Sequence, residues 1–229
     1  MSVREQSKEE RRRRIVATAR RLVHEGGIDN LSMKLLAQRA GVSVVTPYNL
    51  FGSKQDVMLA VIDEDVASFQ QRLAKTRHRN ELEALFRAVT LAKQVYAAEP
   101  NFYRSVLLAV YNSGGREFRA MFSGPRRAFW QDLVGRAIAA GFIRRDVEAA
   151  PLTLHLAHVF ASVLLNWVLG DITLDEMEAQ IQYGFALSLM GVSTAKSREQ
   201  INGWYRRCER KAADFGRRRT RARTAAKMS

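Results

Sequence analysis

The stretch GVSVVTPYNLFGSK, residues 41–54, lies between two segments with the apolar spacing of helices, SMKLLAQRA at 32–40 and QDVMLAVIDEDV at 55–66. It places two adjacent valines, a proline and Tyr48 in a short connection. A loop does not need the valines or the aromatic ring, and the interior of a helix disfavours proline. The stretch therefore predicts a short helix with an unusual outward face.

Two frames for this helix are compatible with the sequence. In the first, Ser43 is the N-cap and residues 44–46 form the first turn, where N–H groups have no intrahelical acceptor and Pro47 gives up at most one bond. In the second, Thr46 is the N-cap and Pro47 takes the first helical position, which proline favours. We favour the first frame, because the second leaves little more than one turn of helix.

The residues before this stretch predict two more helices. The first runs from about Ser7 to Glu25, has an apolar stripe at Ile15, Ala19, Leu22 and Val23, and stops at Gly26-Gly27. Ser32 suits the N-cap of a second, short helix. Gly41 can take the positive φ of a tight connection to the third helix. Two short helices joined by a glycine-containing turn form the pattern of a helix-turn-helix, although any small helical bundle contains similar corners.

At this point the segment GGIDNLSMKLLAQRAGVSVVTPYNLFGSKQDVMLAVI, residues 26–62, resembles the DNA-binding domain of TetR-type transcriptional regulators. The resemblance rests on Ser32, Ala37, Ala40-Gly41-Val42-Ser43, Thr46, Tyr48, Phe51 and Ser53-Lys54, and covers roughly residues 10–62. It implies an all-α fold, with an N-terminal three-helix helix-turn-helix domain followed by a C-terminal helical ligand-binding and dimerisation domain.

The outward face of the third helix predicts contacts with DNA. Valine side chains suit the thymine methyl in a major groove, hydroxyls can donate to phosphates, and Asn49 can read adenine or hold a phosphate. The resemblance implies that Lys34 reaches a base edge and that Lys54, opening the fourth helix, holds a phosphate. The predicted DNA-binding residues are Ser32, Lys34, Ser43, Val44, Val45, Thr46, Tyr48, Asn49 and Lys54. For each polar residue, the alternative is a solvated surface side chain.

One departure from the family limits what the resemblance implies. Family members usually carry Gly, Lys or Arg where Val44 and Val45 stand, so their base preferences are not transferred to this chain.

The rest of the chain divides into a body and a tail. We predict a DNA-binding domain at 1–54, a helical ligand-binding and dimerisation domain at 55–195, and an extra helix with a basic, disordered tail at 196–229. In the family the middle region lines a ligand pocket, and aromatic walls suit a hydrophobic or aromatic effector. The candidate lining residues are Phe102, Tyr103, Tyr111, Phe118, Phe122, Phe129 and Trp130. Plain core packing is the alternative for each of them.

Two apolar segments, residues 149–171 and 173–190, predict the dimer interface. The preceding GFIRRD, residues 141–146, resembles the family's lead-in to two helices that form an intersubunit four-helix bundle. The first segment is long enough to span a bilayer, but its polar residues favour a buried helix. His155 and His158 have no neighbouring cysteine or carboxylate that would complete a metal site, so we expect them to be buried polar or interface residues.

Charge is concentrated at the two ends of the chain. The net charge is +14, and residues 1–14 carry six Arg or Lys against three Glu, whereas residues 196–229 carry twelve against three acidic residues. Such basic ends favour a polyanion as partner. For the tail the candidates are flanking DNA, a coenzyme A ester or RNA, and simple solubility is the alternative.

The remaining features narrow the function class. One cysteine and a basic start without an apolar stretch favour the cytoplasm. The sequence lacks G-x-S-x-G, H-E-x-x-H and a glycine-rich phosphate loop, so we predict no enzyme, cofactor or metal site. Two hypotheses stay open: a dimeric repressor released by a small molecule, and a constitutive architectural protein bound mainly through its basic tail.

Overall fold

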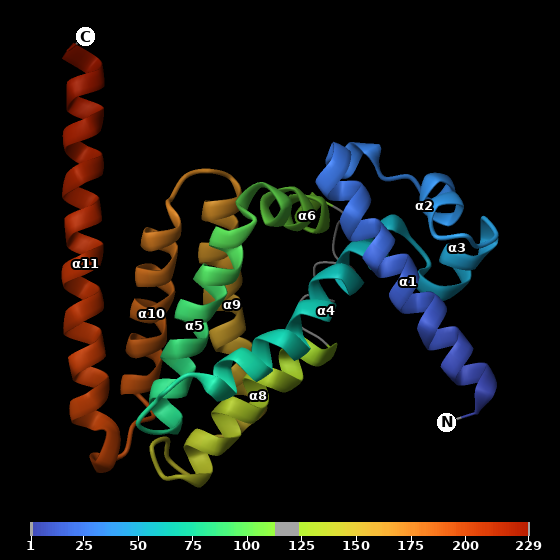
Figure 1. The fold of residues 1–229 in the computed structure, drawn as a ribbon. Coiled ribbons are helices and arrows are strands. Elements are labelled where there is room, and N and C mark those ends of the chain that lie inside the picture. Colours follow the sequence, from blue (N-terminus) through green and yellow to red (C-terminus); the bar gives the residue numbers. More distant parts are fainter. Residues whose placement is uncertain (1, 113–123, 229) are drawn as a thin grey trace. The chain divides into compact units, whose positions relative to one another are not determined.

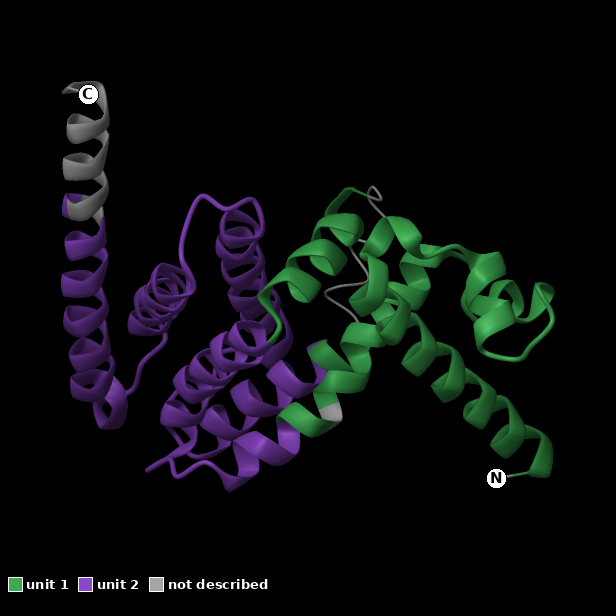
Figure 2. Ribbon diagram, turned by 45° about the horizontal axis from the view of Figure 1, so that its top comes forward, with its two compact units in different colours: residues 1–69, 99–126 green, residues 70–98, 127–229 purple. Residues whose placement is uncertain are grey.

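The computed structural model describes residues 2–112 and 124–228 of the chain. Within these ranges every regular element is helical, apart from one isolated antiparallel bridge between Ile143 and Ser193 (Figure 1). The predicted all-α class is therefore confirmed. The chain divides into two compact units, residues 1–69 with 99–126 and residues 70–98 with 127–229 (Figure 2).

The first unit contains the helix-turn-helix. Its elements are α1 (Val3–Gly26), the 3-10 turn η1 (Ile28–Asn30), α2 (Met33–Arg39), α3 (Val45–Phe51), most of α4 (Lys54–Lys75) and α6 (Pro100–Asn112). The core is formed by apolar side chains with almost no exposed surface, among them Ile15 on α1, Leu36 on α2 and Val57 on α4. The stripe on α1 that the sequence predicts is thus the buried side of this helix.

The second unit is a helical bundle. It contains α5 (Glu81–Ala98), most of α8 (Gly124–Ala139), α9 (Ala149–Val168), α10 (Leu174–Met190) and α11 (Ala195–Met228). The central element is α10, which packs against α5, α9 and α11. Its start is fixed by a capping box, in which the Thr173 hydroxyl accepts from the Glu176 N–H and the Glu176 carboxylate accepts from the Thr173 N–H.

The first helix starts earlier than predicted. Ser2 accepts a hydrogen bond from the Glu5 N–H, and the Glu5 carboxylate accepts one from the Ser2 N–H, which again forms a capping box. The helix therefore begins at Val3 and not near Ser7. It ends at Gly26, as predicted, with Gly27 at a φ of 73°.

Two of the predicted boundaries differ from the structure. The fourth helix runs unbroken from Lys54 to Lys75, and the compact units change within it, at Phe69, while α6 joins the first unit. The predicted boundary at residue 54 marks a connection between two helices, and not the edge of a compact unit.

The tail also differs from the prediction. Helix α11 continues to Met228, where we expected an extra helix followed by a disordered tail. Alanine, arginine and lysine, which dominate this segment, are strong helix formers.

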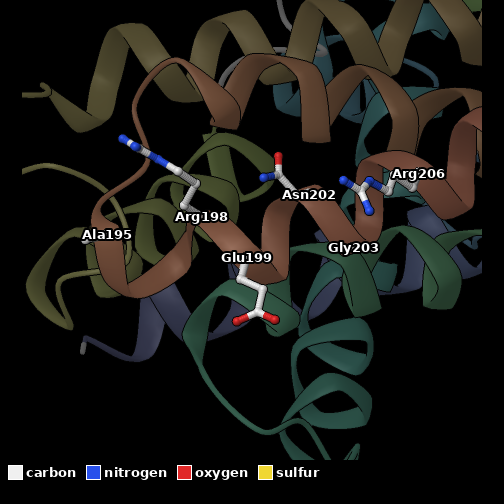
Figure 3. Close-up of a pocket in the computed structure, with 6 residues that line it drawn as sticks. All are labelled: Ala195, Arg198, Glu199, Asn202, Gly203 and Arg206. Carbon is white, nitrogen blue, oxygen red and sulfur yellow. The ribbon is translucent and has the colours of Figure 1, made fainter.

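The N-terminal half of α11 is docked on the bundle. Ser197, Ile201 and Cys208 are almost completely buried along one side. Trp204 stacks on Phe86 of α5, with 4.3 Å between the ring centroids. The opposite side forms an open groove, whose lining residues are spaced along the helix (Figure 3): Ala195, Arg198, Glu199, Asn202, Gly203 and Arg206.

We expect this docked half of α11 to contribute strongly to stability. Replacement of Ile201, which has no exposed surface, by alanine should lower the free energy of unfolding by about 2–5 kcal/mol. The matched control is Glu199→Ala on the exposed side of the same helix, for which we expect a change of about 0.5 kcal/mol or less. Urea unfolding followed by circular dichroism measures both. Equal effects of the two variants would contradict the docking of α11.

Candidate nucleic-acid interface

The third helix begins close to the first of the two predicted frames. Val44 already has helical angles, with φ at −57° and ψ at −29°, and the regular helix starts at Val45. The Thr46 N–H donates to the Ser43 carbonyl over 2.9 Å. One detail differs from the prediction: the Ser43 hydroxyl bonds to the Thr46 hydroxyl over 2.7 Å and caps no backbone N–H.

The inner side of α3 explains the proline. Pro47 lies in the first turn, where it loses little hydrogen bonding, and its ring is buried. The helix ends at Gly52, whose N–H donates to the Tyr48 carbonyl over 2.8 Å. The φ of Gly52 is 92°, a value that strains other residues, so the helix ends there.

The outward side of α3 is open to solvent. Val44, Val45 and Tyr48 are 49%, 60% and 50% exposed, and Asn49 is also exposed. Thr46 is half-buried. Large apolar side chains exposed together on a short helix indicate a contact surface, because a solvent-facing side does not require them. The chemistry offered is methyl groups, one phenol and one amide.

The second helix supplies two further predicted residues. The Ser32 hydroxyl accepts from the Leu35 N–H over 3.1 Å, which confirms it as the N-cap of α2. Lys34, two residues into the helix, is exposed, and α2 packs directly against α3. The ammonium group of Lys34 is thus carried by the helix next to the exposed face.

Lys54 has a structural partner that sequence reasoning did not predict. Its Nζ donates to the Ile28 carbonyl over 2.6 Å and thereby ties the start of α4 to η1. The first turn of α4 is capped by Ser53, which accepts from the Asp56 N–H and donates to the Asp56 carboxylate. A carboxylate therefore already lies at the N-terminus of α4, but the Lys54 ammonium keeps donors to spare because it has three.

Arg12 is a residue of this surface that sequence reasoning missed. Its Nη1 donates to the carbonyl of Leu50, in the last turn of α3, over 3.2 Å. Its guanidinium also lies 4.5 Å from the centroid of the Phe51 ring. A cation suits the C-terminal end of a helix, where carbonyls lack intrahelical donors. Arg12 is one of four consecutive arginines, so the sequence alone does not single it out. Its contact with the last turn of α3 distinguishes it from the other three.

A second cluster links α1 to α4 and α6. Arg20 of α1 pairs with Asp65 over 2.8 Å and with Glu99 over 3.0 Å. The Tyr103 hydroxyl of α6 donates to Asp65 over 2.7 Å. Burial raises the pKa of Tyr103, and the hydrogen bond to Asp65 raises it further. Phe102 completes the cluster, since it stacks on His24 and lies under the Arg20 guanidinium.

The predicted effector-binding aromatics that the structure describes are divided between the two compact units. Phe102 and Tyr103 are buried in the first unit, where they contact α1, and Tyr111 is half-buried on the same helix. Phe129 and Trp130 lie in the second unit, where Trp130 also contacts Phe160 and Phe185, each with 5.8 Å between ring centroids. Two other candidates, Phe118 and Phe122, lie outside the described residues.

Helices α9 and α10 pack closely within the second unit. A Cβ on Gly184 would come within 2.5 Å of Val159 Cγ1, so only glycine allows this approach. His155 Nε2 lies 2.9 Å from the Ser188 hydroxyl, which makes His155 a polar contact between the two helices. The length and composition of α9 would suffice to cross a membrane, a test that core helices of soluble proteins also pass.

Comparisons with known proteins agree with this geometry. Residues 15–61 match the family model described as bacterial regulatory proteins, tetR family. The chain is 25% identical, over 169 residues, to the HTH-type transcriptional repressor KstR of Rhodococcus jostii (strain RHA1), a match that covers 73% of this chain and 75% of the relative.

Two solved structures share the fold. One is FadR of Thermus thermophilus, a TetR-family transcriptional repressor in complex with lauroyl-CoA, with a TM-score of 0.64, 20% identity, and coverage of 80% of this chain and 95% of that one. The other is a TetR transcriptional regulator from Rhodococcus sp. RHA1, with a TM-score of 0.65, 19% identity, and coverage of 82% and 100%. Together with the helix-turn-helix of residues 32–51, these matches identify the chain as a TetR-family transcriptional regulator.

Proposed function

We propose that the protein is a repressor that binds a palindromic operator as a homodimer and is released by a hydrophobic or aromatic small molecule. The observation that carries the proposal is the exposed face of α3, on which Val44, Val45 and Tyr48 are each about half open to solvent. The repressor direction is supported by the relative from Rhodococcus jostii. Such a protein would act in the cytoplasm.

On the exposed face, some side chains suit the reading of bases and others suit the positioning of the helix on the DNA backbone. Val44 and Val45 present methyl groups, and in the major groove only thymine offers a methyl group to contact them. Tyr48 and Lys54 present donors that suit phosphate oxygens, which position a helix without reading sequence, whereas Lys34 on α2 is assigned to a base edge. The joined hydroxyls of Ser43 and Thr46 have one further proton to donate, and Ser32 keeps acceptor capacity at the start of α2.

Selection of bound fragments from random duplex DNA tests the DNA-reading assignment. We expect the wild-type protein to enrich a palindrome, because a twofold-symmetric dimer reads two identical half-sites. In Val45→Ala the preference at A·T pairs should fall by about 1 kcal/mol, or roughly fivefold, through loss of methyl contacts. Tyr48→Phe is the matched control, since it should weaken binding to all duplexes alike by losing a phosphate contact.

The selection also separates the proposal from the architectural alternative. An architectural protein would enrich no palindrome and would bind duplexes with little regard to sequence. Uniform weakening of all duplexes by Val45→Ala would contradict base reading by this valine.

The dimer is supported by the surface of α9 and α10. These helices keep three large apolar side chains 40–47% exposed, namely Leu154, Leu187 and Met190. Contact between two copies would bury these side chains, and the close approach of α9 to α10 at Gly184 lets the two helices present them as one surface. We therefore assign the dimer interface to α9 and α10.

Replacement of Leu187 by glutamate should dissociate the dimer. A buried carboxylate without a partner costs several kcal/mol, so the dissociation constant of the dimer should rise at least about 100-fold. Sedimentation equilibrium measures the change, and Arg198→Glu on the exposed side of α11 is the control. A dimer of unchanged affinity in Leu187→Glu would show that the interface lies elsewhere.

The effector site is assigned to the aromatic cluster of the second unit. Trp130 is half-buried and meets the rings of Phe129, Phe160 and Phe185, which together form an apolar, aromatic environment that suits a hydrophobic effector. A neighbour with the same fold is in complex with lauroyl-CoA, which supports an apolar chain as one class of effector. An effector releases DNA only if it binds the free protein more tightly than the operator-bound protein.

Two probes test this site, lauroyl-CoA as an aliphatic ligand and naphthalene as an aromatic one. We expect at least one to bind by calorimetry, and its affinity for the operator-bound protein should be about tenfold lower. Trp130→Ala should weaken binding of that probe about tenfold, whereas Trp204→Phe, at the α11 contact, should not. Equal binding to the free and operator-bound protein would refute release by this route.

A further inference from the structure

The N-terminal part of α1 extends beyond the folded core as a free helix. Along α1 the first buried residue is Ile15, and nearly every side chain before it is exposed. Residues 3–11, which precede the docked Arg12, therefore form an overhang of about 14 Å at 1.5 Å per residue. The overhang is helical, because the capping box of Ser2 and Glu5 fixes its first turn. Figure 1 shows this part of α1 running past α3.

The overhang carries its charges in an ordered way. Arg4, Lys8 and Arg11 are spaced by four and three residues, and the same spacing continues through Ile15, Ala19 and Leu22. One stripe of α1 is thus cationic along the overhang and becomes apolar where it enters the core. Acidic residues of the overhang, Glu5, Glu9 and Glu10, lie off this stripe.

The stripe is oriented toward the recognition helix. Arg12 follows Lys8 by four residues, so the two side chains are neighbours on the surface of α1, and Arg12 reaches the last turn of α3 through the Leu50 carbonyl and the Phe51 ring. The side of α1 that carries Arg4 and Lys8 is therefore the side that meets α3. All three cations of the stripe are exposed. Lys8 lies near Glu5, whose pKa is lowered by hydrogen bonds with Ser2 and also by Lys8. Arg11 Nε donates to the Ser7 carbonyl over 3.1 Å.

We infer that this stripe is a second DNA-backbone contact, which binds duplex phosphates next to those held by the helix-turn-helix. A row of exposed cations on the side of α1 that meets α3 matches the phosphate row of a duplex in charge and is continuous with the proposed reading surface. The contact lies outside the segment that matches the family model, residues 15–61. The inference rests on the proposed operator binding.

The test compares two charge-matched double variants. Arg4→Gln with Lys8→Gln removes two cations from the stripe, and Arg13→Gln with Arg21→Gln removes two exposed cations from the opposite side of α1. Operator affinity is measured by fluorescence anisotropy at several salt concentrations. Each lost phosphate contact reduces the slope of log affinity against log salt by about 0.9. The stripe variant loses two contacts in each subunit of the dimer, so it should lose about 3.6 from the slope. Its deficit relative to wild type should be about 150-fold larger at 50 mM than at 200 mM salt.

The outcomes separate this inference from the proposed function. If the wild-type protein selects no operator, the proposed function itself fails. If it selects one and the stripe variant keeps the wild-type slope, or if both double variants lose equal slope, only the backbone contact is refuted. Circular dichroism checks that both variants retain the helix content of the wild type.

Discussion

The contact of Arg12 with the end of α3 is the constraint on which the DNA-facing surface depends. A helix of seven residues is too short to be stable alone, because nucleation costs more than so few hydrogen bonds return. The buried ring of Pro47 anchors the first turn of α3, and the helix ends at Gly52. Arg12 holds the last turn by donating to Leu50 and covering Phe51, so the long α1 sets the direction of the short helix.

The same helix joins that surface to the rest of the first unit. Two turns beyond Arg12, Arg20 pairs with Asp65 of α4 and with Glu99 at the start of α6. Burial alone would lower the pKa of Arg20, but Asp65, Tyr103 and Glu99 together raise it, so the guanidinium stays charged at every working pH. Separation of α6 from α1 would leave these partly buried charges without partners, which is costly. The Arg20 cluster therefore opposes any displacement of α6 in which α1 stays behind. A displacement in which α1 moves with α6 would also move α3.

The sequence was most informative where a residue's role depends on its near neighbours. Ser32 as a cap and the glycine at 27 follow from rules that span a few residues, and the frame of α3 follows from Pro47. The start of α1 was misjudged, although Ser2 and Glu5 form a readable capping box. The roles of Arg12 and Lys54 depend on contacts between residues 26 or more positions apart, which no local pattern contains. The division of the aromatic residues between two units is likewise a property of the tertiary fold. The tail was misjudged for another reason: its charge suggests disorder, while the helix propensity of arginine and alanine favours α11.

In the operator complex that we propose, affinity and specificity have separate sources. The exposed valines of α3 carry no charge, so they can discriminate among bases but add little to attraction at long range. The cations of the α1 overhang have the opposite character, since phosphates are the same at every base pair and their attraction falls steeply with salt. Because Arg12 fixes α1 against the end of α3, phosphates held by the overhang in the proposed complex would also limit the register in which the valines meet the groove. A nonspecific contact on a rigid helix thus contributes to specificity by restricting the positions from which α3 can read.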